Sequence, residues 1–111
     1  MEDAIRKIMT QPEKVEHILN GCCDYFGLKR EDLQAENGSR SHIWNKKRYI
    51  LSILMDKTAL SINEIKSLLG YKQYGTVVFH YNNIKDGLSE ESYGNDKTKM
   101  IYNELLTFLK L

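Results

Sequence analysis

The chain has 111 residues, of which 41% are hydrophobic, and its 16 basic and 15 acidic residues give a net charge of +1. This length fits one domain, because most domains have about 100 to 150 residues. No run approaches the roughly 20 apolar residues of a membrane span, and the charged start "MEDAIRKIMT" lacks the apolar core of a signal peptide. We therefore expect residues 1–111 to form a single soluble, cytoplasmic domain with no membrane partner.

The charges are segregated along the chain. Residues 40–85 carry eight Lys or Arg against two acids, a net of +6, whereas residues 1–39 carry −3 and residues 86–111 carry −2. Attraction to phosphate needs a local basic face rather than a high overall charge, so this distribution permits DNA binding. Mixed surface charges on a helical protein also produce such a swing by chance.

Cysteine and histidine residues give no sign of a metal site. Cys22 and Cys23 are adjacent in an apolar segment, with no second pair, and we expect both to be reduced and buried. His17, His42 and His80 share no metal-ligand spacing, so each is interpreted as a surface or half-buried side chain. We expect neither a metal nor a cofactor.

The first predicted helix follows the stretch "TQPE". Thr10 with Glu13 has the spacing of a capping box, and Gly27 is a typical helix stop. The expected apolar face consists of Val15, Ile18, Leu19, Cys22 and Phe26. A short helix over "KREDLQAE" follows, which the turn signal Asn37-Gly38 ends.

A central core helix is predicted next, capped by Ser39 or Ser41. Its expected apolar stripe consists of Ile43, Ile50, Leu51 and Leu54, which the aliphatic stem of Lys47 joins.

The stretch "SINEIKSLLGYKQYGTVVFHYNNI", residues 61–84, has an apolar helical period on each side of a glycine-bearing break. Ser61 and Glu64 form a second predicted capping box, and Gly70 closes that helix after the inward-facing Ile62, Ile65, Leu68 and Leu69. The next helix starts between Gln73 and Thr76, and its inward side chains are Val77, Tyr81, Ile84 and Leu88. Its exposed first turns then present Tyr74, Gly75, Thr76, Phe79 and His80.

Exposed aromatic side chains near a helix start tend to mark a contact surface. The alternative is that Phe79 packs under a loop or under the N-terminal helix.

A last helix begins after "SEESYGND", where Asn95 or Asp96 is the expected cap. Its apolar stripe consists of Ile101, Leu105, Phe108 and Leu109. Helical spacing thus recurs from end to end, and no segment shows the alternation of a strand. The predicted fold is all-α, a compact bundle of about five to seven helices that contains a helix-turn-helix.

In order and spacing, "YFGLKREDL", "GSRS", a long helix, "LSINEIKSLLG" and "GTVVFHYNNI" resemble the C-terminal DNA-binding domain of the bacterial replication initiator DnaA. That fold is similar to the Trp repressor. The resemblance covers residues 13–88, with one extra residue before Ser61, and leaves 89–111 as an additional C-terminal helix. It implies a stand-alone domain that binds double-stranded DNA.

The resemblance also implies site residues. The family's minor-groove arginine falls on Arg40, and the second threonine of its Asp-His-Thr-Thr signature falls on Thr76. Gln73, Tyr74 and Phe79 are the other expected base or groove contacts, whereas Gly75 adds no side chain. The expected phosphate contacts are Ser39, Ser41, Lys46, Lys47, Arg48 and Lys72. A solvated helix face is the alternative interpretation of these basic residues.

This chain departs from the family where Gln73, Tyr74 and Gly75 replace Asp-His-Thr, and where Glu36 lies in a loop that is strongly basic in the family. A weaker or altered target site would follow. No GxxxxGK[ST] loop occurs, so no nucleotide is expected to bind, and no nucleophile and base are paired. We expect no enzyme.

The first hypothesis is therefore a small bacterial transcription or replication regulator, such as one from a mobile element, that binds duplex DNA. The second is an interaction module whose former recognition face, with Tyr74, Val78 and Phe79, binds a protein or a second copy. A third has a small effector between the helices, although no residue indicates which ligand.

Overall fold

A computed structural model describes residues 10–34, 41–88 and 96–111 of the chain. These ranges hold five α-helices and one 3-10 helix: α2 (Gln11–Phe26), η1 (Arg30–Leu33), α3 (Ser41–Lys57), α4 (Ile62–Leu68), α5 (Tyr74–Leu88) and α6 (Asp96–Leu109). No strand occurs within them, which confirms the predicted all-α fold. None of the described helices is long and apolar enough to cross a bilayer.

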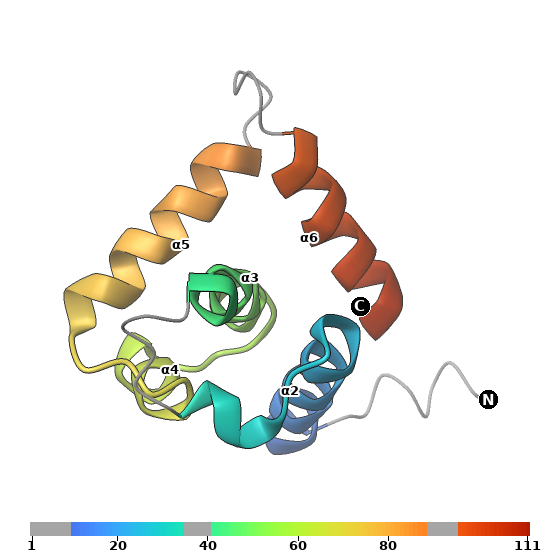
Figure 1. The fold of residues 1–111 in the computed structure, drawn as a ribbon. Coiled ribbons are helices and arrows are strands. Elements are labelled where there is room, and N and C mark those ends of the chain that lie inside the picture. The colour runs from blue at the N-terminus through green and yellow to red at the C-terminus, as the bar shows by residue number, and fades with distance from the viewer. Residues whose placement is uncertain (1–9, 35–40, 89–95) are drawn as a thin grey trace.

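Helix α3 lies at the centre of the molecule. Figure 1 shows it nearly end-on, with α2, α4, α5 and α6 arranged around it. Ile50, Leu51, Ile53 and Leu54 are each 0% exposed, and Tyr49 and Ser52 are buried beside them. The sequence predicted one apolar stripe, but α3 is buried on every side over these residues because neighbouring helices contact it from several directions.

The predicted helix boundaries at both capping boxes are confirmed. At the start of α2, the Glu13 amide donates to Thr10 Oγ1 at 3.3 Å and the Thr10 amide donates to Glu13 Oε1 at 3.2 Å. Ser61 and Glu64 make the same reciprocal pair at α4, at 3.1 and 2.9 Å. Each pair satisfies two amides that a helix start leaves without an internal partner.

Asp56, near the end of α3, connects three helices. Its carboxylate accepts hydrogen bonds from Tyr81 at 2.8 Å and Lys85 at 2.8 Å, both on α5, and from Tyr102 of α6 at 2.5 Å. Burial alone would raise the pKa of Asp56, but the hydrogen bonds from Lys85, Tyr102 and Tyr81 outweigh it, so that the pKa is lowered. The carboxylate is therefore ionised at neutral pH.

The C-terminal helix α6 packs closely against α2 and α5. Leu109 occupies the space that a side chain at Gly21 of α2 would fill, and a Cβ at Gly87 of α5 would lie 2.9 Å from Thr98 Cγ2. His17 Nε2 also donates to the Leu109 carbonyl at 2.6 Å. These close approaches make α6 part of the same core.

Three sequence-based details differ from the structure or lie beyond it. Of the short helix expected over 29–36, the described residues 29–34 form the single turn of η1, in which Asp32 accepts from the Lys29 amide at 2.9 Å. Phe108 is 50% exposed, because Tyr102, Leu105 and Leu109 form the buried stripe of α6 instead. The proposed caps Ser39, Ser41, Asn95 and Asp96 lie outside the residues or side chains that the structure describes.

Cys22 and Cys23 are free and buried, as the sequence predicted. Burial, and secondarily the neighbouring Cys23, raise the pKa of Cys22 to about 12. The Cys22 thiol is therefore protonated and unreactive at neutral pH.

Candidate nucleic-acid interface

Helices α4 and α5 are joined by a tight turn over residues 69–73. Gly70 has a φ of 69°, in the left-handed region, and the Tyr71 amide donates to the Lys66 carbonyl at 3.0 Å. This bond is characteristic of the Schellman motif, which ends a helix with a left-handed residue. The turn therefore depends on Gly70, which the sequence predicted as the end of this helix.

The end of η1 packs against the same turn. A Cβ at Gly70 would lie 2.8 Å from the Gln34 carbonyl oxygen and 2.9 Å from that of Leu33. Gln34 Nε2 donates to the Ser67 carbonyl at 3.0 Å and also to the Leu68 carbonyl. Residues that follow η1 thus fix the end of α4, and through it the direction in which α5 starts.

The first turns of α5 are open to solvent. Gln73 precedes the helix and is exposed, and its carbonyl accepts from the Thr76 amide at 3.2 Å. Tyr74 is 52% exposed and Phe79 59% exposed, whereas Thr76 is half-buried. The predicted groove contacts Gln73, Tyr74, Thr76 and Phe79 are therefore neighbours on one helix start, and three of the four are exposed.

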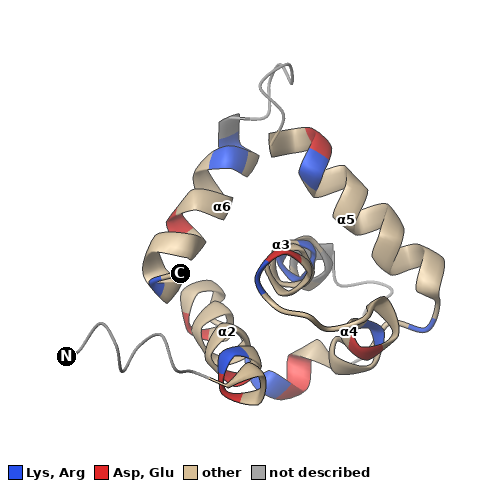
Figure 2. Ribbon diagram, turned by 180° about the vertical axis from the view of Figure 1, so that it is seen from behind, with Lys and Arg blue, Asp and Glu red and all other residues tan. Residues whose placement is uncertain are grey.

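The exposed face of α5 has no formal charge over most of its length. Residues 73–84 contain no Lys, Arg, Asp or Glu. Figure 2 shows this part of α5 in tan, with a basic residue only in the turn that precedes it and charged residues again near its end. Lys72 is the basic residue of that turn, where it is exposed as predicted.

Beneath α5 lies a group of side chains that carry charge or can gain it. Lys47 is only 3% exposed, and its Nζ lies 4.7 Å from the centroid of the Tyr71 ring. The His80 ring is 5.6 Å from the same Tyr71 ring and 5.5 Å from that of Phe79. Burial, and then the positive charges of Arg48 and Lys47, lower the pKa of His80 to about 4.

The prediction that His80 belongs to the exposed start of the helix is therefore wrong. His80 is 1% exposed and neutral at physiological pH. Its position four residues after Thr76 places it on the side of α5 that packs against α3.

The three consecutive basic residues of α3 do not form one surface. Lys46 Nζ donates to the Phe26 carbonyl at the end of α2, at 3.3 Å. Arg48 Nη1 instead donates to Asn83 Oδ1 of α5, at 2.9 Å. Lys47 points beneath the turn, and burial lowers its pKa.

Lys47 does not fit its predicted role as a phosphate contact, because the residue is only 3% exposed and its Nζ lies over the Tyr71 ring. Lys46 is directed to α2 rather than to α5. Of the predicted phosphate contacts whose side chains the structure describes, Arg48 and Lys72 remain as candidates near the exposed helix. Arg40, Ser39 and the Ser41 side chain lie outside the part of the chain that the structure describes.

Two polar residues of α5 were not among the predicted contacts. Asn82 and Asn83 are exposed, and they lie about one turn after Phe79 on the same side of the helix. The spacing from Phe79 could have identified them, but the resemblance drew attention to the helix start alone.

The sequence that forms this interface is basic, although its basic side chains have different surroundings. Residues 43–55 and 65–84 contain five Lys or Arg and no Asp or Glu.

Among the described residues, no group of three or more His, Cys, Asp or Glu side chains could hold a metal. No known protein-family model matches the sequence.

Proposed function

We propose that this chain binds double-stranded DNA and that α4, the turn and α5 act as a helix-turn-helix. The exposed start of α5 would enter the major groove, as the second helix of such motifs does. A small regulator of transcription or replication, of the kind that the DnaA-like spacing implies, is the role we favour.

The observation that carries the proposal is the exposed, acid-free start of α5 beside Lys72. The amides at a helix start and the positive end of its dipole favour a phosphate oxygen. Gln73 can pair with an adenine edge, and Tyr74 can contact a thymine methyl or a phosphate. No carboxylate between residues 65 and 84 would repel the DNA backbone.

The test is a fluorescence-anisotropy titration with a random duplex and with an A/T-rich initiator-type duplex. Each is measured at about 50 and 200 mM salt, between which a protein with several phosphate contacts loses orders of magnitude in affinity. Salt-sensitive binding that prefers one duplex would support a sequence-specific DNA-binding protein. No binding at the lower salt concentration would contradict the proposal.

Two substitutions separate phosphate contacts from base contacts. Lys72→Gln should weaken binding to every duplex alike and reduce the salt slope by about 1, whereas Gln73→Ala should cost about 1 to 3 kcal/mol on preferred duplexes only. Lys97→Gln, at an exposed lysine of α6, is the matched control and should leave both quantities unchanged. Equal effects of Lys72→Gln and Lys97→Gln would rule out the assigned interface.

A second candidate function, a protein-interaction module, rests on the aromatic exposure of the same helix. Tyr74 and Phe79 are both more than half exposed on a stretch without formal charge. If this face binds a second copy, sedimentation should give twice the monomer mass at high concentration, and Phe79→Asp should restore the monomer. A mass that stays monomeric throughout would exclude self-association.

A further inference from the structure

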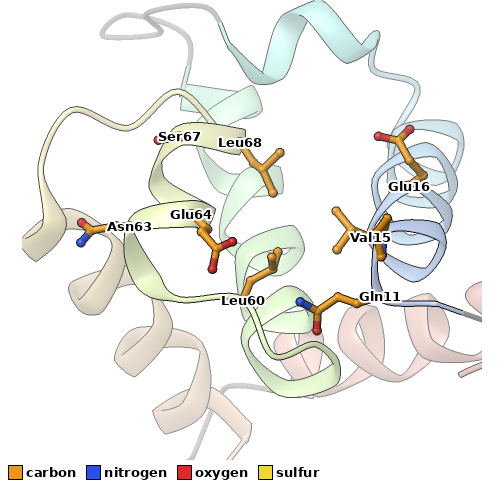
Figure 3. Close-up of a pocket in the computed structure, with 9 residues that line it drawn as sticks. Gln11, Val15, Glu16, Leu60, Asn63, Glu64, Ser67 and Leu68 are labelled. Carbon is orange, nitrogen blue, oxygen red and sulfur yellow. The ribbon is translucent and has the colours of Figure 1, made fainter.

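The groove between α2 and α4 is an unfavourable place for DNA. It is lined by residues of these two helices and by Leu60, and no residue of α5 takes part (Figure 3). Glu16 and Glu64 stand on its two sides, and no Lys or Arg is among its lining residues. Carboxylates repel a phosphate backbone. The uncharged stretch of α5 is therefore the more favourable surface for contacts with bases.

Phe79 and Asn83 are neighbours on the exposed face of α5. They are four residues apart, a spacing that places two Cβ atoms about 5 to 6 Å from each other on one side of a helix. Phe79 is 59% exposed, and Asn83 is also exposed. Charged residues return at Lys85 and Asp86, so this pair lies near the end of the uncharged stretch. An apolar ring and an amide are thus presented side by side.

Arg48 fixes the orientation of the Asn83 amide. Its Nη1 donates to Asn83 Oδ1 at 2.9 Å. A guanidinium has donors and no acceptor, so the oxygen is the atom of the amide that must face Arg48. The amide nitrogen lies on the other side of the same carbon and is left to donate to a ligand. Asn83 therefore differs from a freely rotating asparagine, which offers both a donor and an acceptor.

These two side chains match the major-groove edge of one base. Thymine presents its C5-methyl group beside the O4 acceptor, whereas cytosine presents an amino donor, adenine an acceptor with a donor, and guanine acceptors without a methyl group. We propose that Phe79 and Asn83 together read one thymine. The Phe79 ring contacts the methyl group, and Asn83 Nδ2 donates to O4. Thymine recognition rests on the proposed function and adds to it the base that the middle of α5 reads.

The test measures binding to chemically altered thymines. The wild type first selects a preferred duplex from a random pool at about 50 mM salt. Each thymine of that duplex is then replaced in turn by uracil, which lacks the methyl group and keeps O4. At one position, uracil should weaken wild-type binding about fourfold, the effect of roughly one buried CH₂ group. Phe79→Ala should bind the thymine and uracil duplexes equally at that position, because the ring that contacts the methyl group is absent.

A pair of 5-methylcytosine with guanine tests Asn83, because this base keeps the methyl group and replaces O4 by an amino donor. At the position that is sensitive to uracil, it should weaken wild-type binding about threefold to tenfold, the effect of one lost hydrogen bond. Asn83→Asp keeps an acceptor for Arg48 and loses the donor, so its preference should reverse towards 5-methylcytosine. Asn82→Asp is the matched control, with the same change at another exposed asparagine, and should keep the wild-type preference.

Phe79, Asn82 and Asn83 are exposed, so these substitutions leave the core unchanged, and circular dichroism checks that each variant is folded. Suppose that the wild type binds a preferred duplex, but the uracil and 5-methylcytosine effects fall at different positions, or Asn82→Asp reverses the preference instead. The thymine assignment is then wrong, while DNA binding stands. If the wild type binds no duplex at about 50 mM salt, the proposed function and the thymine assignment both fail.

Discussion

Lys46, Lys47 and Arg48 show how a run of like charges on a helix is divided among different surroundings. Each residue of an α-helix is rotated by about 100° from the one before, so three consecutive side chains cannot share one face. Lys46 contacts the end of α2, Lys47 lies beneath Tyr71, and Arg48 contacts α5. The sequence could predict their charge, but not their partners, because these depend on which helices pack around α3.

His80 leads to a prediction about pH. Its pKa falls from 6.5 to about 4 in the folded chain, so an unfolded chain binds a proton first as the pH is lowered. The stability that His80 contributes is fully present above pH 6.5 and is lost progressively towards about pH 4, by roughly 3 kcal/mol in all. Urea unfolding at several pH values should therefore show a decline over this window in the wild type that His80→Phe lacks.

His80→Phe keeps a ring between Tyr71 and Phe79, so the comparison concerns the slope against pH rather than absolute stability. Parallel curves for the two proteins between pH 6.5 and 4 would contradict a buried neutral His80.

Among the elements, those with local signals were predictable from the sequence. Thr10, Ser61, Gly27 and Gly70 define helix ends through bonds to residues a few positions away, and each behaves as expected. The buried side of α5 was less predictable. Val77 and Ile84 were assigned correctly, but His80 was not, because the angle at which α5 crosses α3 decides how far burial extends around the helix.

Gly70 and Gly75 provide a matched pair of substitutions at either end of the turn. Gly70→Ala should destabilise the protein by about 2 kcal/mol or more, because alanine at positive φ costs about 1 to 2 kcal/mol and its Cβ would also meet the backbone of Gln34. Gly75→Ala should be neutral or stabilising by up to about 1 kcal/mol, since its Cβ would meet nothing within 4 Å and alanine favours the helix.

Thermal unfolding followed by circular dichroism measures both changes. Similar losses for the two variants would mean that the turn does not depend on the left-handed conformation of Gly70.

At the scale of the whole molecule, the hydrophobic period predicted about five to seven helices, and the described residues hold five α-helices and one 3-10 helix. The sequence also predicted that α3 is the central helix, but it did not predict which residues connect the other helices to it. Asp56 illustrates the difference. In the sequence it is one of two acids in a basic region, whereas in the structure it holds α5 and α6 to the central helix. Its three partners lie 25 to 46 residues away along the chain, so no local pattern could reveal them.

Asp56→Asn should lower the free energy of unfolding at pH 7 by about 2 to 3 kcal/mol, because the charged acceptor of three hydrogen bonds is lost. The pKa of Asp56 is below its usual 3.8, so the wild type keeps this advantage at neutral pH and loses it as the pH falls through the lowered value. Urea titrations of both proteins at pH 7 and at pH 2 to 3 should show their stabilities converging in acid. If the difference in free energy of unfolding were the same at both pH values, Asp56 would act through packing rather than through its charge.

Leu105 and Phe108 test whether α6 belongs to the same cooperative unit. Leu105 is 0% exposed, so Leu105→Ala should cost about 2 to 5 kcal/mol, whereas Phe108→Ala, at a side chain that is 50% exposed, should cost much less. Circular dichroism and the fluorescence of Trp44 on α3 should report the same unfolding midpoint in every variant. Separate midpoints would show that α6 unfolds by itself.

Because α3 is enclosed by other helices, hydrogen exchange of its backbone amides can report the stability of the whole fold. Backbone amides of residues 50–54 lie in a helix whose side chains are almost wholly buried, so deuterium can reach them only when the surrounding helices separate. Their exchange rates therefore report the global opening of the fold under native conditions. A ligand that binds only the folded chain slows this exchange in proportion to its occupancy. Binding at the outer surface, by DNA or by a protein, can thus be measured at the centre of the molecule.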